Sequence, residues 1–385
     1  MKVLFTSWPA WGHLLPILPL ARALRQAGHS VVLATGQDMQ EDLIRHGFDT
    51  WAVGPTAAQA HAALYAAHPD HDSVPREQKM AVTVARMFGP AGAQRAEDLL
   101  PRAESWAPDV VISTPGDPAG AVVATRTGAR HVIHSVGLVI PGIESVMSLL
   151  TAAAGERFGI DDLYQRVTTA PVLDIGPASL RLPGAPLLAN ARPLRPSPGD
   201  PDPDPDIAAR IAALPYQRTV YLTLGTIFNG APRVFEAALA GLAGLSVNVV
   251  ITTGPGVDQA RFGRPGRHVL MRPRIAQASV LPWCDAVISH AGAGTMLGAL
   301  CFGRPQVSLP MGADQPFNAS AVQRAGAGLT VEPDSVTPDN IAAAAERILK
   351  DPPFAQAAQR VQQEILGMPA PADVAQGLTD LVTAA

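Results

Sequence analysis

The stretch Met1–Thr35 reads MKVLFTSWPAWGHLLPILPLARALRQAGHSVVLAT, and the order of its residue types decides the fold. The run Lys2–Thr6 predicts a short buried strand, and apolar residues at helical spacing from Leu14 to Gln26 predict a helix. Gly28 stands where a glycine commonly follows a helix, and Ser30–Thr35 is a second run typical of a buried strand. The chain therefore opens with a predicted strand, helix and parallel strand.

The same alternation continues along both halves of the chain. Further strands are expected at Pro108–Ser113, His131–Ser135, Thr219–Leu224, Ser246–Thr252, Ala286–Ser289 and Gln306–Leu309. Helices are expected at Ala93–Glu104, Pro232–Leu242, Gly294–Phe302, Pro338–Lys350, Phe354–Leu366 and Ala372–Val382. Continuous apolar strands that alternate with helices indicate parallel sheets covered on both faces. The expected fold class is α/β, with doubly wound, Rossmann-like sheets.

A Pro- and Asp-rich segment divides the chain. Arg192–Asp206 reads RPLRPSPGDPDPDPD, and these residues exclude both a helix and a central strand, so we interpret the segment as a linker. The chain has 385 residues, more than the ~250–300 at which a single core stops growing. We expect one domain at 1–200 and a second at 201–370.

Composition limits the partners and the compartment. With a net charge of −4 and 16% charged residues, the chain lacks the basic field that holds nucleic acid. The N-terminus lacks the long apolar region of a signal peptide, and no run reaches the ~18 apolar residues of a membrane helix. Cys284 and Cys301 lack CxxC spacing, as expected in a reducing compartment. We expect a cytoplasmic protein with neither nucleic-acid nor membrane partners.

Two segments that follow predicted strands carry residues suited to chemistry. Open parallel sheets bind ligands beyond the carboxyl ends of their strands. In SWPAWGHLLP, His13 lies at the mouth of a helix, where an imidazole with a pKa near ~6.5 can take a proton. In TLGT, Gly225 allows a ligand to approach the backbone, and the Thr226 hydroxyl can donate to a phosphate. The alternative for His13 is a helix cap or a polar group of the core, and the alternative for TLGT is a strand-to-loop turn with a capping Thr.

Two later segments suggest receptors for an anion and for hydroxyl groups. In SHAGAGT, free N–H groups at a helix start form an anion site, to which His290 and Thr295 add donors. Its glycines also form GxGxxxG with Gly298, so an NAD(P)-dependent oxidoreductase that uses Gly292, Gly294 and Gly298 is an alternative. In MGADQPFN, Asp314 and Gln315 suit vicinal sugar hydroxyls, with a solvated loop as the alternative.

Taken together, these segments resemble the family 1 glycosyltransferases of the inverting, two-Rossmann GT-B type, especially the bacterial enzymes that decorate natural products. The opening stretch resembles their signature GHxxPxxxLAxxLxxxGHxV. The stretch RPRIAQASVLPWCDAVISHAGAGTMLGALCFGRPQVSLPMGADQPFNASAVQRAGAG resembles their donor-binding signature almost end to end. The resemblance spans essentially the whole chain. It implies two facing domains with a cleft between them, and a C-terminal helix in 371–385 that crosses back to the first domain.

The resemblance implies that His13 is the catalytic base. It would take the proton of an acceptor hydroxyl as the oxygen attacks the anomeric carbon, which inverts that centre. Many relatives orient the base with an Asp at the position of Thr114, and Asp117 is the substitute expected here. Trp8 and Trp11, in the same segment as His13, are expected to contact the acceptor.

The resemblance also implies how a nucleoside diphosphate sugar is bound. The matching positions are His290, Gly292, Gly294 and Thr295 for the diphosphate, Gly225 and Thr226 for a second phosphate contact, Arg274, Ile275 and Gln277 beside the nucleobase, and Asp314 and Gln315 on the sugar. Helix N–H groups stabilise a departing diphosphate, so neither a divalent metal nor another cofactor is expected. A dTDP- or UDP-sugar is the expected donor, and the family association favours a deoxysugar on dTDP.

Other patterns leave alternatives open. Asp202–Asp206 contains the DxD of metal-dependent transferases, but inside the Pro-rich linker. His61, His68 and His71 fit no zinc spacing, so we interpret their segment as an acceptor loop. The regions 50–92 and 137–171 are apolar, which suits either a hydrophobic acceptor such as a polyketide or a buried helix wall. Thr114 also leaves open a non-catalytic homologue that acts as a partner protein.

Overall fold

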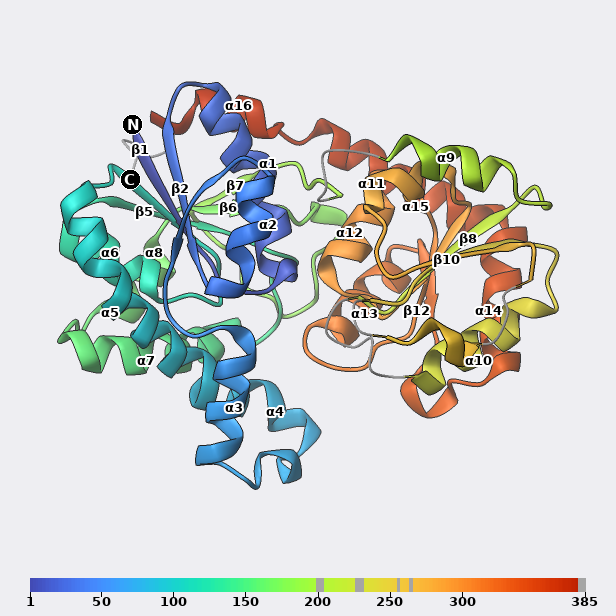
Figure 1. Ribbon diagram of the computed structural model, residues 1–385, viewed down its shortest axis with the longest axis horizontal. Helices are drawn as coiled ribbons and strands as arrows, with labels where there is room; N and C mark the ends of the chain where they lie inside the picture. Colours follow the sequence, from blue (N-terminus) through green and yellow to red (C-terminus); the bar gives the residue numbers. More distant parts are fainter. Residues whose placement is uncertain (199–203, 226–231, 255–256, 263–265, 380–385) are drawn as a thin grey trace. The chain divides into compact units, whose positions relative to one another are not determined.

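The chain folds into two compact α/β units (Figure 1). The computed structural model describes residues 1–198, 204–225, 232–254, 257–262 and 266–379. The first unit comprises Met1–Ile175, Pro183–Leu194 and Pro369–Ala385, and the second comprises Gly176–Leu182 and Arg195–Met368. The expected α/β class with two parallel sheets is confirmed.

The sheet of the first unit has seven parallel strands in the order β3-β2-β1-β4-β5-β6-β7. Their bounds are β1 Lys2–Thr6, β2 Ser30–Thr35, β3 Asp49–Ala52, β4 Val110–Ser113, β5 Arg130–His134, β6 Val172–Asp174 and β7 Ala191–Pro193. In the central strand, Val3 pairs with Val31 on one side and Val110 on the other. Val3, Leu4 and Phe5 are completely buried, as expected for a strand covered on both faces.

Helices cover this sheet on both faces. They are α1 Trp11–Gln26, α2 Gln40–Arg45, α3 Ala57–Ala67, α4 Arg76–Thr83, α5 Gly89–Trp106, α6 Ala119–Thr127, α7 Ile143–Phe158, α8 Leu163–Thr169 and α16 Pro371–Gln376. Helix α1 begins earlier than Leu14, so Trp11 and His13 belong to its first turn. Helix α16 packs on α1. It ends at Gln376, before Gly377, and the expected end at Val382 lies outside the described residues.

The second unit contains a six-stranded parallel sheet in the order β10-β9-β8-β11-β12-β13. Its strands are β8 Thr219–Thr223, β9 Asn248–Thr252, β10 Val269–Arg272, β11 Ala286–Ser289, β12 Gln306–Ser308 and β13 Gly328–Thr330. Its helices are α9 Pro205–Ala212, α10 Pro232–Ala243, α11 Gln277–Val280, α12 Ala293–Cys301, α13 Gln315–Arg324, α14 Pro338–Lys350 and α15 Pro352–Gly367. Val220 and Leu222 of β8 belong to one apolar core and Tyr221 to the other, so both faces of the sheet are buried.

The expected linker Arg192–Asp206 is partly built into regular structure. Its first residues belong to β7, which is an edge strand and therefore tolerates Pro193. At its other end, Asp204 accepts a hydrogen bond from the Asp206 N–H at 2.9 Å and caps α9, which begins at Pro205. The expectation that this segment excludes a helix was wrong there, because proline is favoured in the first turn of a helix.

Both sheets reverse their winding direction at one pair of central strands. In the first unit the chain passes from β1 outward to β3 and then returns to β4, and in the second it passes from β8 to β10 and returns to β11. The carboxyl ends of such a pair form the crevice in which open parallel sheets bind ligands. No helix in the described part of the chain is long and apolar enough to cross a membrane.

Candidate functional site

His13 lies at the winding reversal of the first unit. It follows β1 in the first turn of α1, and its half-buried ring lies against Gly116 in the loop after β4. A Cβ on Gly116 would be 2.9 Å from Cε1 of the ring, so only a glycine fits without displacing it. Burial, and then the nearby Arg95 cation, lower the pKa of His13 to about 4. The ring is therefore neutral at pH 7 and able to accept a proton.

Asp117, the expected partner of His13, is engaged with Arg95 instead. Its Oδ1 lies 3.2 Å from Arg95 Nε, and both side chains are completely buried. The Ala119 N–H also donates to this oxygen at 3.3 Å. Burial raises the pKa of Asp117, and the arginine opposes that rise. His13 Nδ1 lacks a hydrogen-bond partner within the described residues. The ring therefore contacts Gly116, the neighbour of Asp117, without a hydrogen bond to the Asp117 carboxyl group.

Thr114 and the two tryptophans differ in their surroundings. Thr114 is buried and donates to the Ser7 hydroxyl at 3.4 Å, which ties the loop after β4 to the loop after β1. Trp8 is 4% exposed, and its ring centroid lies 4.2 Å from that of Phe88. Trp11 is half-buried at the start of α1. Of the two expected acceptor contacts, only Trp11 therefore presents appreciable surface.

Sequence reasoning missed Arg95, the residue that links these groups. It lies on α5, one helical turn after Ala91 and one before Leu99, and both of these residues are buried. Its guanidinium carbon lies 5.5 Å from the centroid of the Trp8 ring. The signal was present in the sequence, because an arginine between apolar residues at i−4 and i+4 falls on the buried face of an amphipathic helix.

In the second unit, His290 is enclosed between two glycines at the winding reversal. A Cβ on Gly225, which follows β8 and has a φ of +74°, would be 2.6 Å from Cε1 of His290. A Cβ on Gly292, at the N-cap of α12, would be 2.4 Å from Nε2. Burial lowers the pKa of His290 to about 4. These two glycines therefore fix a neutral imidazole at the start of α12.

The first turn of α12 is ordered by Gln277. The Gln277 amide nitrogen donates to the Thr295 hydroxyl at 2.9 Å, and a Cβ on Gly298 would be 2.8 Å from its amide oxygen. Gly298, the last glycine of GxGxxxG, thus makes room for a side chain of this chain. A Cβ on Gly294 would meet no atom within 4 Å, so the space beside this position is open.

Asp314 and Gln315 lie where α13 begins, and both are built into hydrogen bonds. Gln315 is buried, and its amide oxygen accepts from the N–H groups of Met311 at 2.7 Å and Gly312 at 3.1 Å. Asp314 accepts from Asn318 at 2.8 Å, and Asn318 also donates to the Ala291 carbonyl at 2.9 Å. Asn318, to which the sequence assigned no role, therefore ties the loop before α13 to the loop before α12.

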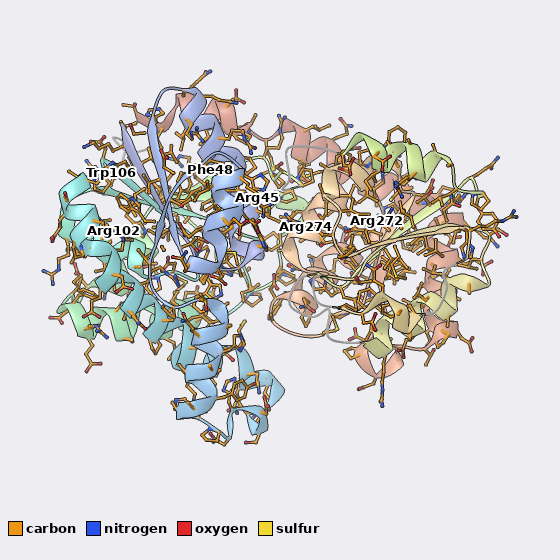
Figure 2. All side chains as sticks on the ribbon, in the orientation of Figure 1. Arg45, Phe48, Arg102, Trp106, Arg272 and Arg274 are labelled. Carbon is orange, nitrogen blue, oxygen red and sulfur yellow. The ribbon has the colours of Figure 1, made fainter. Side chains whose placement is uncertain are left out.

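The remaining expected donor residues lie between β10 and α11 or outside the described residues. Arg274 is exposed and is labelled in Figure 2 with Arg272, whereas Ile275 is 8% exposed and belongs to one of the cores. Thr226 lies outside the described residues.

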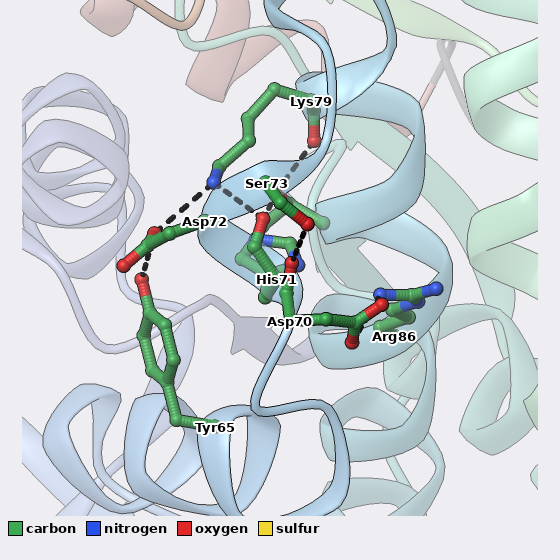
Figure 3. Close-up of polar contacts among 8 residues, drawn as sticks. Tyr65, Asp70, His71, Asp72, Ser73, Lys79 and Arg86 are labelled. Carbon is green, nitrogen blue, oxygen red and sulfur yellow. Dashed lines mark hydrogen bonds and ion pairs between the residues drawn. The ribbon is translucent and has the colours of Figure 1, made fainter.

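The histidine-rich segment after α3 is held by its own contacts (Figure 3). His71 is buried, and its Nε2 lies 3.2 Å from the Thr83 hydroxyl. Asp72 accepts from Tyr65 at 2.8 Å and forms an ion pair with Lys79 at 3.2 Å. These bonds give His71 a structural role.

The DxD segment is likewise occupied by structural contacts where it can be described. Asp204 caps α9 and Asp206 pairs with Arg210 at 2.6 Å, while Asp202 lies outside the described residues. Across the described ranges, His, Cys, Asp and Glu side chains form no group of three that could hold a metal ion.

Comparisons with known proteins cover nearly the whole chain. The model of the erythromycin biosynthesis protein CIII-like N-terminal domain matches residues 22–187, and that of the C-terminal domain matches residues 237–381. The elloramycin glycosyltransferase of Streptomyces olivaceus is 34% identical over 97% of this chain and 96% of its own length. The TDP-daunosamine transferase of Streptomyces peucetius is 28% identical over 99% and 97%. The solved structure of the glycosyltransferase SnogD from Streptomyces nogalater matches with a TM-score of 0.75 and 29% identity over 99% of both chains.

Proposed function

Because this chain belongs to the erythromycin biosynthesis protein CIII-like family of natural-product glycosyltransferases with the GT-B fold, we propose that it transfers a deoxysugar from a dTDP donor to a hydroxyl of an apolar aglycone. The transfer inverts the anomeric centre and needs no metal. Family membership sets aside the oxidoreductase interpretation of Gly292, Gly294 and Gly298.

The observation that carries the proposal is the enclosure of His290 by Gly225 and Gly292 at the start of α12. A helix N-terminus attracts anions through its free N–H groups and its dipole. His290 adds an imidazole, and the open space at Gly294 leaves room for a ligand beside the backbone. A diphosphate is the anion proposed for this position. As the bond to the sugar breaks, the N–H groups stabilise the charge that the diphosphate gains.

The proposed base is His13. Its ring is neutral at pH 7, since burial lowers its pKa to about 4, and it can accept the proton of an acceptor hydroxyl. Attack of that oxygen on the face opposite the diphosphate inverts the anomeric carbon. Asp314 and Gln315 are proposed to hold sugar hydroxyls, and similarity to the TDP-daunosamine transferase supports a TDP-linked donor.

The test is a mass-spectrometric screen of the purified protein, in EDTA, against dTDP- and UDP-sugars and a panel of apolar hydroxyl acceptors. A glycosylated product is expected with at least one pair. His13→Ala should retain donor binding and lose transfer by ~10²-fold or more, whereas His46→Ala, at the end of α2, should not change it. Unchanged turnover in His13→Ala would remove His13 from its role. Donor binding without transfer to any acceptor would favour a non-catalytic partner protein.

A further inference from the structure

Arg95 is a buried cation whose hydrogen-bonding capacity is only partly used. Its Nε pairs with Asp117 at 3.2 Å, while Nη1 and Nη2 lack partners within the described residues. Burying a guanidinium is costly unless its charge and donors are satisfied. If Arg95 served only to tie α5 to the loop after β4, more of its N–H donors would be expected to have hydrogen-bond partners.

The position of Arg95 gives its charge influence over the end of the sheet where His13 lies. Its guanidinium faces the ring of Trp8, which follows β1. A Cβ added to Gly54, which follows β3, would lie 2.9 Å from the Cβ of Arg95. Its charge also lowers the pKa of Asp38, after β2, against the larger effect of burial. The charged groups around this region include the Arg95 cation, the carboxyl groups of Asp117 and Asp38, and that of Asp98, which accepts a hydrogen bond from the Gly54 N–H at 2.9 Å.

This arrangement reverses the usual electrostatics of a histidine base. A carboxylate beside the ring stabilises the imidazolium and strengthens the base. Here Thr114 occupies the loop position of such an acid, and the Asp117 carboxylate is taken by Arg95. A cation near the ring favours its neutral form, which makes it a weak base. The same cation favours negative charge on an oxygen that lies beside the ring.

We propose that Arg95 fits this site to an acceptor with an acidic hydroxyl, a phenol or an enol, in preference to an aliphatic alcohol. The inference rests on the proposed role of His13. The acceptor O–H bond breaks and its proton passes to the His13 ring, while the oxygen forms a bond to the anomeric carbon of the nucleoside diphosphate sugar. The bond from that carbon to the diphosphate breaks, and the diphosphate leaves with the electron pair. Arg95 is a positioning residue that acts through its field.

A matched acceptor pair tests the preference. With the dTDP- or UDP-sugar that the screen selects, kcat/KM for 1-naphthol should exceed that for 1-naphthalenemethanol by ~10²-fold or more. Arg95→Met should lower the rate with 1-naphthol about tenfold and reduce the ratio of the two kcat/KM values. It should also move the acidic limb of the pH profile to higher pH, because removal of the cation raises the pKa of His13. Arg95→Lys should restore most of the preference. Arg102→Met, an exposed position on the same helix (Figure 2), should change none of these. Equal transfer to both acceptors, or an unchanged ratio in Arg95→Met, would overturn the proposal.

A second measurement needs no sugar transfer and keeps the inference separate from the proposed function. The absorbance of 4-nitrophenol distinguishes phenol from phenolate, so titration with the full chain reports the ionisation of the bound probe. We expect its apparent pKa to fall by about one unit in the wild type and not in Arg95→Met. Arg95→Met/Asp117→Asn provides a charge-balanced variant if the single variant does not fold. If the probe does not bind, or its ionisation is unshifted in the wild type, the inference is wrong even when His13 is confirmed as the base.

Discussion

The backbone of Gly116 lies against the imidazole of His13, so that a Cβ on this glycine would be 2.9 Å from Cε1. The contact joins the loop after β4 to the first turn of α1, and it fixes the ring by packing. Orientation of His13 therefore depends on the absence of a side chain at Gly116.

Gly116→Ala should displace the His13 ring. Misplacing a reacting group by about 1 Å costs up to ~10²-fold in rate, so we expect turnover to fall by ~10–10²-fold with little change in donor binding. Steady-state kinetics and calorimetric titration with dTDP measure the two effects. The matched control is Gly244→Ala, where a Cβ would meet nothing within 4 Å. Equal activity of the two variants would show that the Gly116 contact does not hold the ring.

Gly292→Ala should weaken binding of a nucleoside diphosphate. The new Cβ would lie 2.4 Å from Nε2 of His290, and the backbone φ of −61° is ordinary, so crowding of the imidazole is the main effect. We expect the Kd for dTDP or UDP, whichever the protein binds, to rise at least about tenfold, equivalent to ~1.4 kcal/mol. Calorimetry measures this, again with Gly244→Ala as control. An unchanged Kd would separate His290 from the diphosphate site.

The sequence predicted the strands that are formed by continuous apolar runs, and it missed β3, β6, β7, β10 and β13. β1 and β2 are continuous apolar runs, and their bounds, Lys2–Thr6 and Ser30–Thr35, are those expected. β3, Asp49–Ala52, was not predicted, because it starts with an exposed Asp49 and has only half-buried residues after it. β7 contains Pro193, which argues against a central strand and is tolerated only because β7 lies at the edge of the sheet.

At the candidate site, the sequence indicated which loops matter but not which side chains meet. His13 and His290 follow strands at the winding reversals, a position that the alternation of strands and helices already implies. The pairing of Asp117 with Arg95 depends on how α5 packs beside the loop after β4, and no local pattern encodes that contact. The contact of the Gln277 side chain with Gly298 is likewise not encoded by a local pattern. From the sequence alone, Gly298 only completes a glycine motif that resembles a dinucleotide fingerprint.

Arg95→Met should destabilise the first unit. Removing one partner of a completely buried ion pair leaves the other charge uncompensated, so the free energy of unfolding should fall by ~3–5 kcal/mol. Arg95→Met/Asp117→Asn should recover part of that loss, because no buried charge then lacks its partner. Urea unfolding of both variants measures the difference. A double variant less stable than the single one would contradict this account of the pair.

Acid should destabilise the first unit more than the second, because most of the histidines whose pKa is strongly lowered lie in it. Burial lowers the pKa from 6.5 to about 4 in His13, His131, His134 and His290, and only the last belongs to the second unit. Between pH 6.5 and about 4, these histidines are protonated in the unfolded chain but remain neutral in the folded chain. The stability is therefore complete above pH 6.5 and is lost as the pH falls toward 4, by up to ~1.4 kcal/mol per pH unit for each histidine.

Urea unfolding from pH 7.5 to 4.5, followed by tryptophan fluorescence, measures this loss. The first unit contains four tryptophans, Trp8, Trp11, Trp51 and Trp106, and the second contains Trp283. The midpoint of the main fluorescence change should therefore move to a lower urea concentration as the pH falls. Asp117 acts in the opposite sense, since burial raises its pKa, and it should offset part of the effect. His131→Gln should flatten the dependence, because the amide keeps a polar group near the Ser113 hydroxyl, 2.8 Å from the ring in the wild type, without titrating. A midpoint that is constant down to pH 4.5 would mean that these histidines are hydrated or already charged in the folded protein.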